Sequence, residues 1–159
     1  MKINKWILLL SAFVFFIQCD SPHFYQEQRS TNNDWNENTA LTFEFEVKDT
    51  LSVYDFYLLS RNNNDFQYSN LYLLTEMKTP VGTVFADTLQ YYLAYQDGEW
   101  IGTGNSLKEL YLLYREGIAL KDTGTYTLSV RHGMREQNLV GIEDISLIID
   151  KKEAHEKTE

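Results

Sequence analysis

The side chain with the clearest chemical role in this sequence is a single thiol that follows an apolar run. Cys19 is the only cysteine, and residues 6–17 before it are apolar or small and begin after Lys2 and Lys5. A helix of this length spans about 18 Å and cannot cross a hydrocarbon core of about 30 Å, so the run is typical of a cleaved export signal. In bacterial lipoproteins, a thiol at this point becomes the diacylglyceryl-modified N-terminus. We therefore predict a lipoprotein signal peptide over residues 1–18 and lipidation at Cys19.

The residues just before Cys19 leave a second interpretation open. Phe16, Ile17 and Gln18 depart from the usual lipobox, which has leucine three positions before the cysteine and a small residue directly before it. An ordinary secretory signal followed by a chance cysteine would also fit.

Trp100 is the first candidate for ligand contact. It follows the turn signal Asp97-Gly98 and precedes Gly102, Gly104 and Asn105. An exposed indole on such a loop could stack on a sugar or anchor a protein contact, so Trp100 and Asn105 are candidate binding residues. Alternatively, Trp100 closes the end of the domain and the glycines let the loop fold over it.

Arg135 is the second candidate, in the connection between two expected strands. Its guanidinium group could recognise a carboxylate or a peptide backbone. The alternative is that Arg135 pairs with one of the many acidic residues of the chain itself.

Residues for catalysis are sparse. Of the three histidines, only His132 falls within the expected domain, and no nucleophile-elbow, zinc-protease or phosphate-loop motif is present. Glu143 and Asp144 are adjacent in an expected strand and would point to opposite faces, so they do not form a catalytic pair. We predict a protein that is not an enzyme, with no cofactor and no metal.

The charge balance argues against nucleic acid as a partner. The whole chain has a net charge of −9. Without residues 1–18, which contain two lysines and no acid, 12 basic residues remain against 23 acidic ones, a formal charge of −11. Such a chain as a whole repels phosphate backbones and anionic membrane surfaces. With Cys19 lipidated, no thiol remains for a disulfide, so the fold depends on packing alone.

Composition divides the chain after the signal peptide into three parts. Residues 19–40 are polar and rich in asparagine, and we interpret them as the lipidated N-terminus and a flexible tether. Tyr25 and Trp35 leave open that this part already packs into the domain. Residues 41–150 form the expected domain, and the charged residues 151–159 an exposed tail.

Within the domain, the hydrophobic pattern indicates strands. Leu41, Phe43, Phe45 and Val47 alternate with polar residues, the period of a half-buried strand. Residues 52–60 are apolar on both faces, as in a central strand. Residues 71–78, 84–95, 125–131 and 141–149 add further strands. Residues 107–114 fit either a helical turn or a strand, and their neighbours favour a strand.

Asp122, Gly124 and Tyr126 have the spacing of a tyrosine corner, in which the hydroxyl group closes a loop onto the backbone upstream. About eight or nine strands with short turns predict an all-β fold, an antiparallel β-sandwich of the jelly-roll or immunoglobulin-like Greek-key type.

Several segments together resemble a known family. The lipoprotein leader, WIGTG (residues 100–104), DTGTYTLSVRHGMR (122–135) and LVGIEDISLIID (139–150) are similar to the GldH family of gliding-motility lipoproteins in the Bacteroidota. The resemblance implies a lipid-anchored cell-envelope protein, expected in the outer membrane, that associates with other gliding lipoproteins and with type IX secretion. It implies no catalytic residue.

Two functions follow as hypotheses. The first is a non-catalytic interaction module, held on the bilayer through Cys19, that docks onto envelope partners. The alternative is a carbohydrate-binding surface lipoprotein that stacks a glycan on Trp100 and neighbouring tyrosines. The exposure of the Trp100 indole distinguishes the two.

Overall fold

The structure is a computed structural model that describes residues 23–152. The predicted signal peptide, Cys19 and residues 153–159 lie outside the described residues. Within the described part, no helix is long and apolar enough to cross a membrane. The regular structure consists of β1 Tyr25–Ser30, β2 Trp35–Asn36, β3 Leu41–Val47, β4 Val53–Asn62, β5 Asn70–Lys78, β6 Val84–Tyr92, β7 Lys108–Ala119, β8 Gly124–His132, β9 Asn138–Leu139 and β10 Ile142–Lys152.

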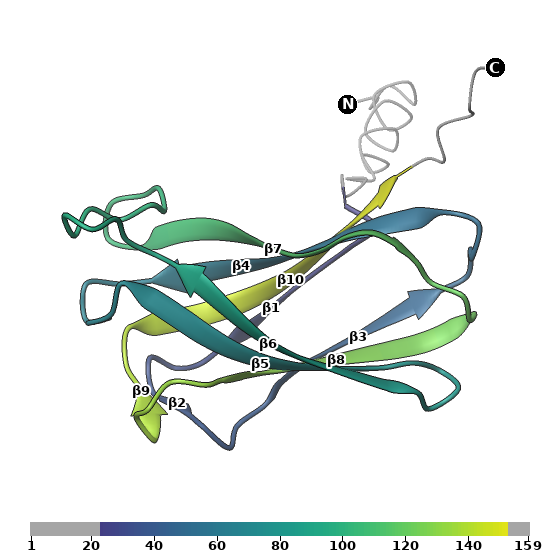
Figure 1. Cartoon of the computed structure of the whole chain (residues 1–159), viewed down its shortest axis with the longest axis horizontal. Coiled ribbons are helices and arrows are strands. Elements are labelled where there is room, and N and C mark those ends of the chain that lie inside the picture. Colours follow the sequence, from purple (N-terminus) through teal and green to yellow (C-terminus); the bar gives the residue numbers. More distant parts are fainter. Residues whose placement is uncertain (1–22, 153–159) are drawn as a thin grey trace, which may run out of the picture.

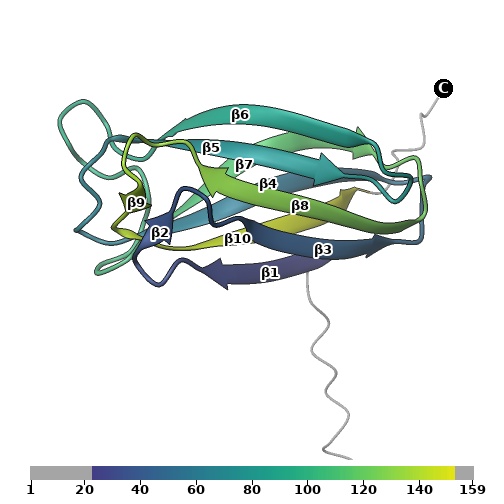
Figure 2. The ribbon, with the colours of Figure 1, turned by 90° about the horizontal axis from the view of Figure 1, so that it is seen from below.

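The eight longer strands form two antiparallel sheets, ordered β1-β10-β4-β7 and β3-β8-β5-β6, and β2 pairs with β9. The sheets lie face to face, with β1 beside β3 at one margin and β6 beside β7 at the other (Figures 1 and 2). The predicted antiparallel β-sandwich is confirmed. The strand order is that of a jelly roll, because the eight long strands form two four-stranded sheets and, apart from the β5–β6 hairpin, consecutive long strands alternate between them.

The core lies between the sheets and follows the period of two along each strand. In β3, Leu41, Phe43, Phe45 and Val47 are buried while Glu44 and Glu46 are exposed, as predicted. In β8, Tyr126, Leu128 and Val130 face the same core. Residues 107–114, which were ambiguous in sequence, lie mostly in β7 and are extended.

The central strands β4 and β10 are buried on both faces. Leu58 and Leu147 point into the core, and the next residues along each strand, Leu59 and Ile148, are also buried but belong to no core cluster. They lie on the outer face, where strand neighbours cover them on both sides. This arrangement explains why residues 52–60 are apolar without alternation.

The predicted tether over residues 19–40 is wrong from Tyr25 onward. β1 pairs with β10 along all six of its residues, and Trp35 in β2 is 1% exposed. The ring of Tyr25 lies 5.7 Å from that of Phe45. Because β1 is an edge strand held mainly by its backbone, its side chains are mostly polar, and composition alone conceals it.

The predicted tail begins later than expected. Lys151 and Lys152 extend β10 and pair with Tyr54 and Val53 of β4. The ammonium group of Lys152 lies 2.6 Å from the carboxylate of Asp55, which is itself buried. These charged residues therefore belong to the sheet.

The tyrosine corner is present. The hydroxyl group of Tyr126 donates to the carbonyl oxygen of Asp122 at 3.1 Å and accepts from the Asp122 N–H at 3.2 Å. The hydroxyl thereby closes the loop that leads from β7 into β8.

The sandwich has two ends with different loops. At the proximal end, β1 begins, β10 stops, and residues 48–52, 79–83 and 120–123 connect strands. The distal end carries residues 31–34, 63–69, 93–107 and 133–137 (Figure 1).

Candidate binding site

An open hollow of about 570 Å³ lies at the distal end, between the start of β5 and the connection from β8 to β9. It is lined by Tyr68, Asn70, Tyr72, Gly133, Met134, Arg135 and Glu136. This hollow contains Arg135, one of the residues singled out from sequence.

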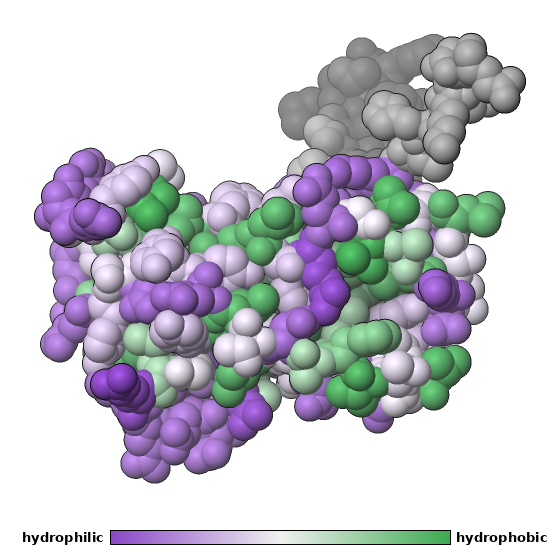
Figure 3. All heavy atoms as spheres, viewed as in Figure 1, coloured by the Kyte–Doolittle hydropathy of each residue, from purple (hydrophilic) through white to green (hydrophobic). Residues whose placement is uncertain are grey.

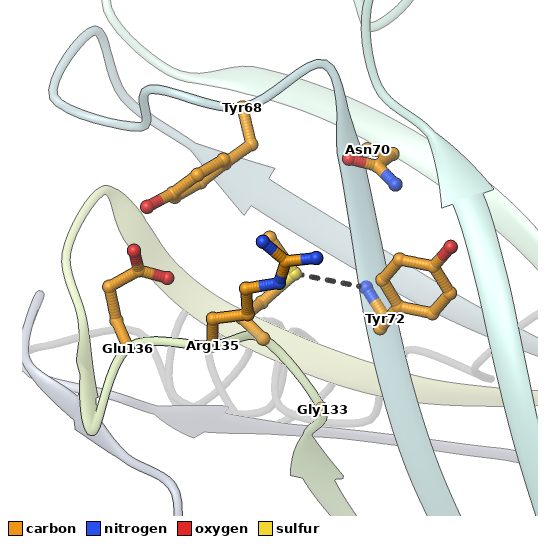
Figure 4. A pocket seen from close by; sticks show the side chains of 7 residues that line it. Tyr68, Asn70, Tyr72, Gly133, Arg135 and Glu136 are labelled. Carbon is orange, nitrogen blue, oxygen red and sulfur yellow. Dashed lines mark hydrogen bonds between the residues drawn. The ribbon is translucent and has the colours of Figure 1, made fainter.

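The two walls are positioned by strand geometry. In β5, Leu71 and Leu73 are fully buried, so Asn70 and Tyr72, which alternate with them, point away from the core. The β8–β9 connection is held against β5 at Tyr72. The N–H of Gly133 donates to the Tyr72 carbonyl oxygen at 2.8 Å, and the Tyr72 N–H donates to the Met134 sulfur at 3.3 Å (Figure 4).

Arg135 is exposed and carries the positive charge of the site. Its side chain rises from the β8–β9 connection into the space between Tyr68 and Tyr72 (Figure 4). Among residues 23–152, no carboxylate lies within ion-pair distance of the guanidinium group of Arg135 or of Arg131, whereas Arg29, Arg61 and Arg115 are paired. The alternative in which Arg135 pairs with an acid of its own chain therefore has no support in this structure.

Glu136 acts on the tyrosine opposite. By hydrogen bonding and by its negative charge, the Glu136 carboxylate raises the pKa of Tyr68 above its ordinary value. The Tyr68 hydroxyl is a hydrogen-bond donor at neutral pH, as tyrosine ordinarily is, and the Glu136 carboxylate favours this protonated form.

His132 lies beneath the hollow and takes no part in it. The ring is 2% exposed and meets the indole of Trp35 edge-on at 5.4 Å. Burial lowers the pKa of His132, while the nearby Trp35 backbone and the charges of Glu37 and Glu136 act in the opposite direction. Within the described residues, no partner of either ring nitrogen meets hydrogen-bond geometry, so His132 is a packing residue.

Trp100 lies near the hollow but does not line it. The indole is half-buried and packs on the core, with its ring 6.3 Å from that of Phe66. Phe66 in turn lies 5.6 Å from Tyr68, so a row of three aromatic rings joins Trp100 to the hollow. The prediction that Trp100 is a binding residue stays a prediction.

The glycines after Trp100 allow close packing. A Cβ atom on Gly104 would lie 2.1 Å from the Leu107 carbonyl oxygen, and one on Gly102 would lie 2.9 Å from that of Glu109. Asn105 is exposed in the same loop and does not reach the hollow. The loop is therefore compact, with Asn105 at its surface.

Sequence reasoning missed Tyr68, Asn70 and Tyr72. A signal could have found two of them. Asn70 and Tyr72 occupy the non-core positions at the start of β5, most of which the alternating pattern predicts. Nothing local places them opposite Arg135, because these segments are more than sixty residues apart in the chain.

The hollow suits binding. Arg135 offers a cation, Asn70 an amide, and Tyr68 and Tyr72 hydroxyl groups and ring faces, which together suit a carboxylate or a polar backbone. In the part of the chain that is described, no group of three His, Cys, Asp or Glu side chains could hold a metal ion.

Comparison with known proteins identifies the family. The family described as GldH lipoprotein matches residues 23–149. This chain belongs to the GldH lipoprotein family. The match begins two residues before β1, so it includes residues 23–40 of the segment interpreted from the sequence as a tether.

Two curated relatives agree with membership in the GldH family. A protein of Christiangramia forsetii named gliding motility lipoprotein GldH homolog is 36% identical over 92% of this chain and 94% of its own length. The gliding motility lipoprotein GldH of Flavobacterium johnsoniae is 32% identical over 94% of this chain and 98% of its own length. The resemblance found in the sequence is confirmed.

Solved structures add nothing to the GldH assignment. Dimeric latent PorU from Porphyromonas gingivalis aligns with 82% of this chain and 13% of its own length, at 9% identity and a TM-score of 0.37. A score this low supports no inference.

Proposed function

We propose that this GldH-family protein is a non-catalytic interaction module of the cell envelope, anchored through acylated Cys19, with its distal hollow as the partner site. The partners would be other gliding-motility envelope lipoproteins, in an assembly associated with type IX secretion at the outer membrane. Family membership and the names of the two relatives support the envelope setting.

The observation that carries the partner site is the unpaired guanidinium group of Arg135. The protein has far more acids than bases, yet this cation has no carboxylate partner in the described residues. Arginine and tyrosine are among the residues enriched where protein contacts contribute most energy. A partner that supplies a carboxylate or a backbone carbonyl would complete its hydrogen bonds.

A glycan ligand has weaker support. The alternative function depended on an open Trp100 indole, and that indole packs on Phe66. The tyrosines of the hollow would have to replace it as the stacking surface, with Asn70 and Arg135 as hydrogen-bond donors.

The test is crosslinking in the native envelope. A photo-crosslinking amino acid at position 70 should give a discrete adduct identifiable by mass spectrometry, and Arg135→Glu should abolish it. Arg131→Glu is the matched control, because Arg131 is an exposed arginine of β8 outside this hollow.

Two outcomes would contradict the proposal. An adduct that survives Arg135→Glu would remove Arg135 from the site. Binding of the purified protein on a glycan array, lost with Tyr72→Ala, would support the carbohydrate alternative.

A further inference from the structure

The chain between the proposed anchor and the domain is short. Only six residue steps separate Cys19 from Tyr25, the first residue of β1, which corresponds to about 21 Å at full extension. β7 alone, with twelve residues, spans about 40 Å along the sandwich. A domain tethered so closely cannot stand off the membrane by its own length, and its proximal end is the end within reach of the lipid.

The loops at this proximal end hold apolar side chains outward. Leu51 is 89% exposed and Val81 69% exposed. Both tips are ordered by local hydrogen bonds. The Asp49 carboxylate accepts from the Leu51 N–H at 2.9 Å, and the Gly82 N–H donates to the Thr79 carbonyl oxygen at 2.9 Å.

The apolar surface continues from the loop tips into a shallow hollow. Val84 and Phe85, at the start of β6, are each about half exposed, at 49% and 51%. Phe85 also lines a largely apolar hollow of about 390 Å³ with Met77, Ile118 and Leu120. In Figure 3 apolar side chains are visible in separate groups at this right-hand end of the molecule. Exposed apolar side chains concentrated at one end are typical of a contact with another phase or another protein.

Lysines surround the same loops. Of the six lysines in residues 23–152, only Lys108 lies at the distal end. The proximal lysines are Lys48, Lys78, Lys121, Lys151 and Lys152. Lys48, Lys151 and Lys152 pair with carboxylates of the chain. No carboxylate of the described part lies within ion-pair distance of Lys78 or Lys121, both of which are exposed.

We propose that the proximal end lies on the bilayer that holds Cys19, with Leu51 and Val81 in the headgroup layer and the ammonium groups of Lys78 and Lys121 on lipid phosphates. The proposal rests on the lipid anchor of the proposed function. A bilayer is the occupant because the anchor keeps it within reach of this end. Although the whole chain is acidic, two lysines without an ion pair beside apolar tips also match the interfacial layer, which takes apolar groups and cationic heads together.

This orientation has a consequence for the distal hollow. Strands that run between the two ends would place Arg135 on the far side of the domain from the lipid, facing partners (Figure 1). An anchor at Cys19 alone leaves the domain free to tumble, whereas a second contact with the bilayer restricts it.

The experiment uses the full lipidated protein in vesicles of phosphatidylethanolamine with a minority of phosphatidylglycerol. Because acylation consumes the Cys19 thiol, Leu51→Cys and Val81→Cys each supply one thiol for an environment-sensitive fluorophore, and Asn105→Cys supplies the matched distal label. We expect blue-shifted emission and strong quenching by headgroup-level nitroxide lipids at positions 51 and 81, and neither at position 105. The double variant Lys78→Glu/Lys121→Glu should reduce the quenching at position 51, while Lys108→Glu should not.

The outcomes separate the two proposals. A protein that floats with the vesicles but shows no quenching at positions 51 and 81, or equal quenching at position 105, overturns the membrane contact and leaves the anchor intact. A protein that does not float contradicts the anchor at Cys19 and, with it, this contact.

Discussion

Arg61 of β4 and Asp144 of β10 form a two-pronged ion pair between the two central strands of one sheet, near their distal ends. The guanidinium Nε lies 2.9 Å from Oδ1 of Asp144, and Nη2 lies 2.6 Å from Oδ2. The Asp144 side chain is almost fully buried, while Arg61 is about a quarter exposed and also approaches Glu109 at 3.7 Å. The pair satisfies a buried carboxylate on the outer face of the two central strands.

Removing the carboxylate of this pair should destabilise the sandwich. Asp144→Ala leaves the partly buried Arg61 with only the distant Glu109, so we expect the free energy of unfolding to fall by about 2–4 kcal/mol. Glu109→Gln, the control, removes an exposed partner and should cost less than about 0.5 kcal/mol. Urea denaturation measures both, and equal losses would contradict the assignment.

The tyrosine corner makes a second stability prediction. Tyr126→Phe keeps the ring and removes both hydrogen bonds to the Asp122 backbone, so the free energy of unfolding should fall by about 1–2 kcal/mol. Tyr95→Phe, at an exposed tyrosine, should change it by less than about 0.5 kcal/mol. If the two variants unfold at the same urea concentration, the corner contributes no stability.

Two glycines with positive φ should respond differently to alanine. Gly141 has φ +93°, and a Cβ there would lie 2.1 Å from the Phe66 backbone nitrogen. Gly82 has φ +88°, and a Cβ there would meet no other atom within 4 Å. Gly82→Ala should therefore cost about 1 kcal/mol, for backbone conformation alone.

Gly141→Ala must in addition move the loop around Phe66. Ordinary substitutions lower the free energy of unfolding by up to about 3 kcal/mol. For Gly141→Ala we expect a larger decrease, or a protein that does not accumulate. Thermal unfolding of both variants measures the difference. Similar melting temperatures would mean that the Phe66 loop gives way freely.

Burial of His132 should make stability depend on pH. Because burial lowers the pKa of His132 in the folded state, the unfolded chain binds a proton first as the pH falls below about 6.5. Because the unfolded state then binds more protons than the folded state, the free energy of unfolding decreases as the pH falls from neutral to the folded-state pKa of His132. The free energy of unfolding should therefore be lower at pH 5.5 than at pH 7.5.

His132→Phe should remove this part of the pH dependence. The substitution keeps an aromatic ring against Trp35 and eliminates two buried nitrogens without hydrogen-bond partners, so stability at neutral pH should be unchanged or higher. Urea denaturation at the two pH values provides the measurement. An unaltered difference between them would assign the effect to other groups.

Strand pattern predicted most of the fold and little of the candidate site. β3 and β8 were predictable because their apolar side chains alternate on one face, and the tyrosine corner because its spacing is local. β1 was missed because an edge strand needs only backbone partners, and Gln26, Gln28 and Ser30 face water. Arg135 was found by its residue type, whereas Tyr68 and Asn70 carry no local signal that sets them opposite it.

The sequence by itself determined the all-β class, the single thiol and the family, and it predicts an export signal, because each is written in residue type and short-range spacing. Only the tertiary structure decided the rest. It closed residues 25–36 into the sandwich, left Arg135 unpaired between two tyrosines, and gathered Leu51, Val81, Lys78 and Lys121 at the end where β1 begins. Those groupings depend on strand order, since antiparallel crossovers between two sheets bring together loops that are distant along the chain.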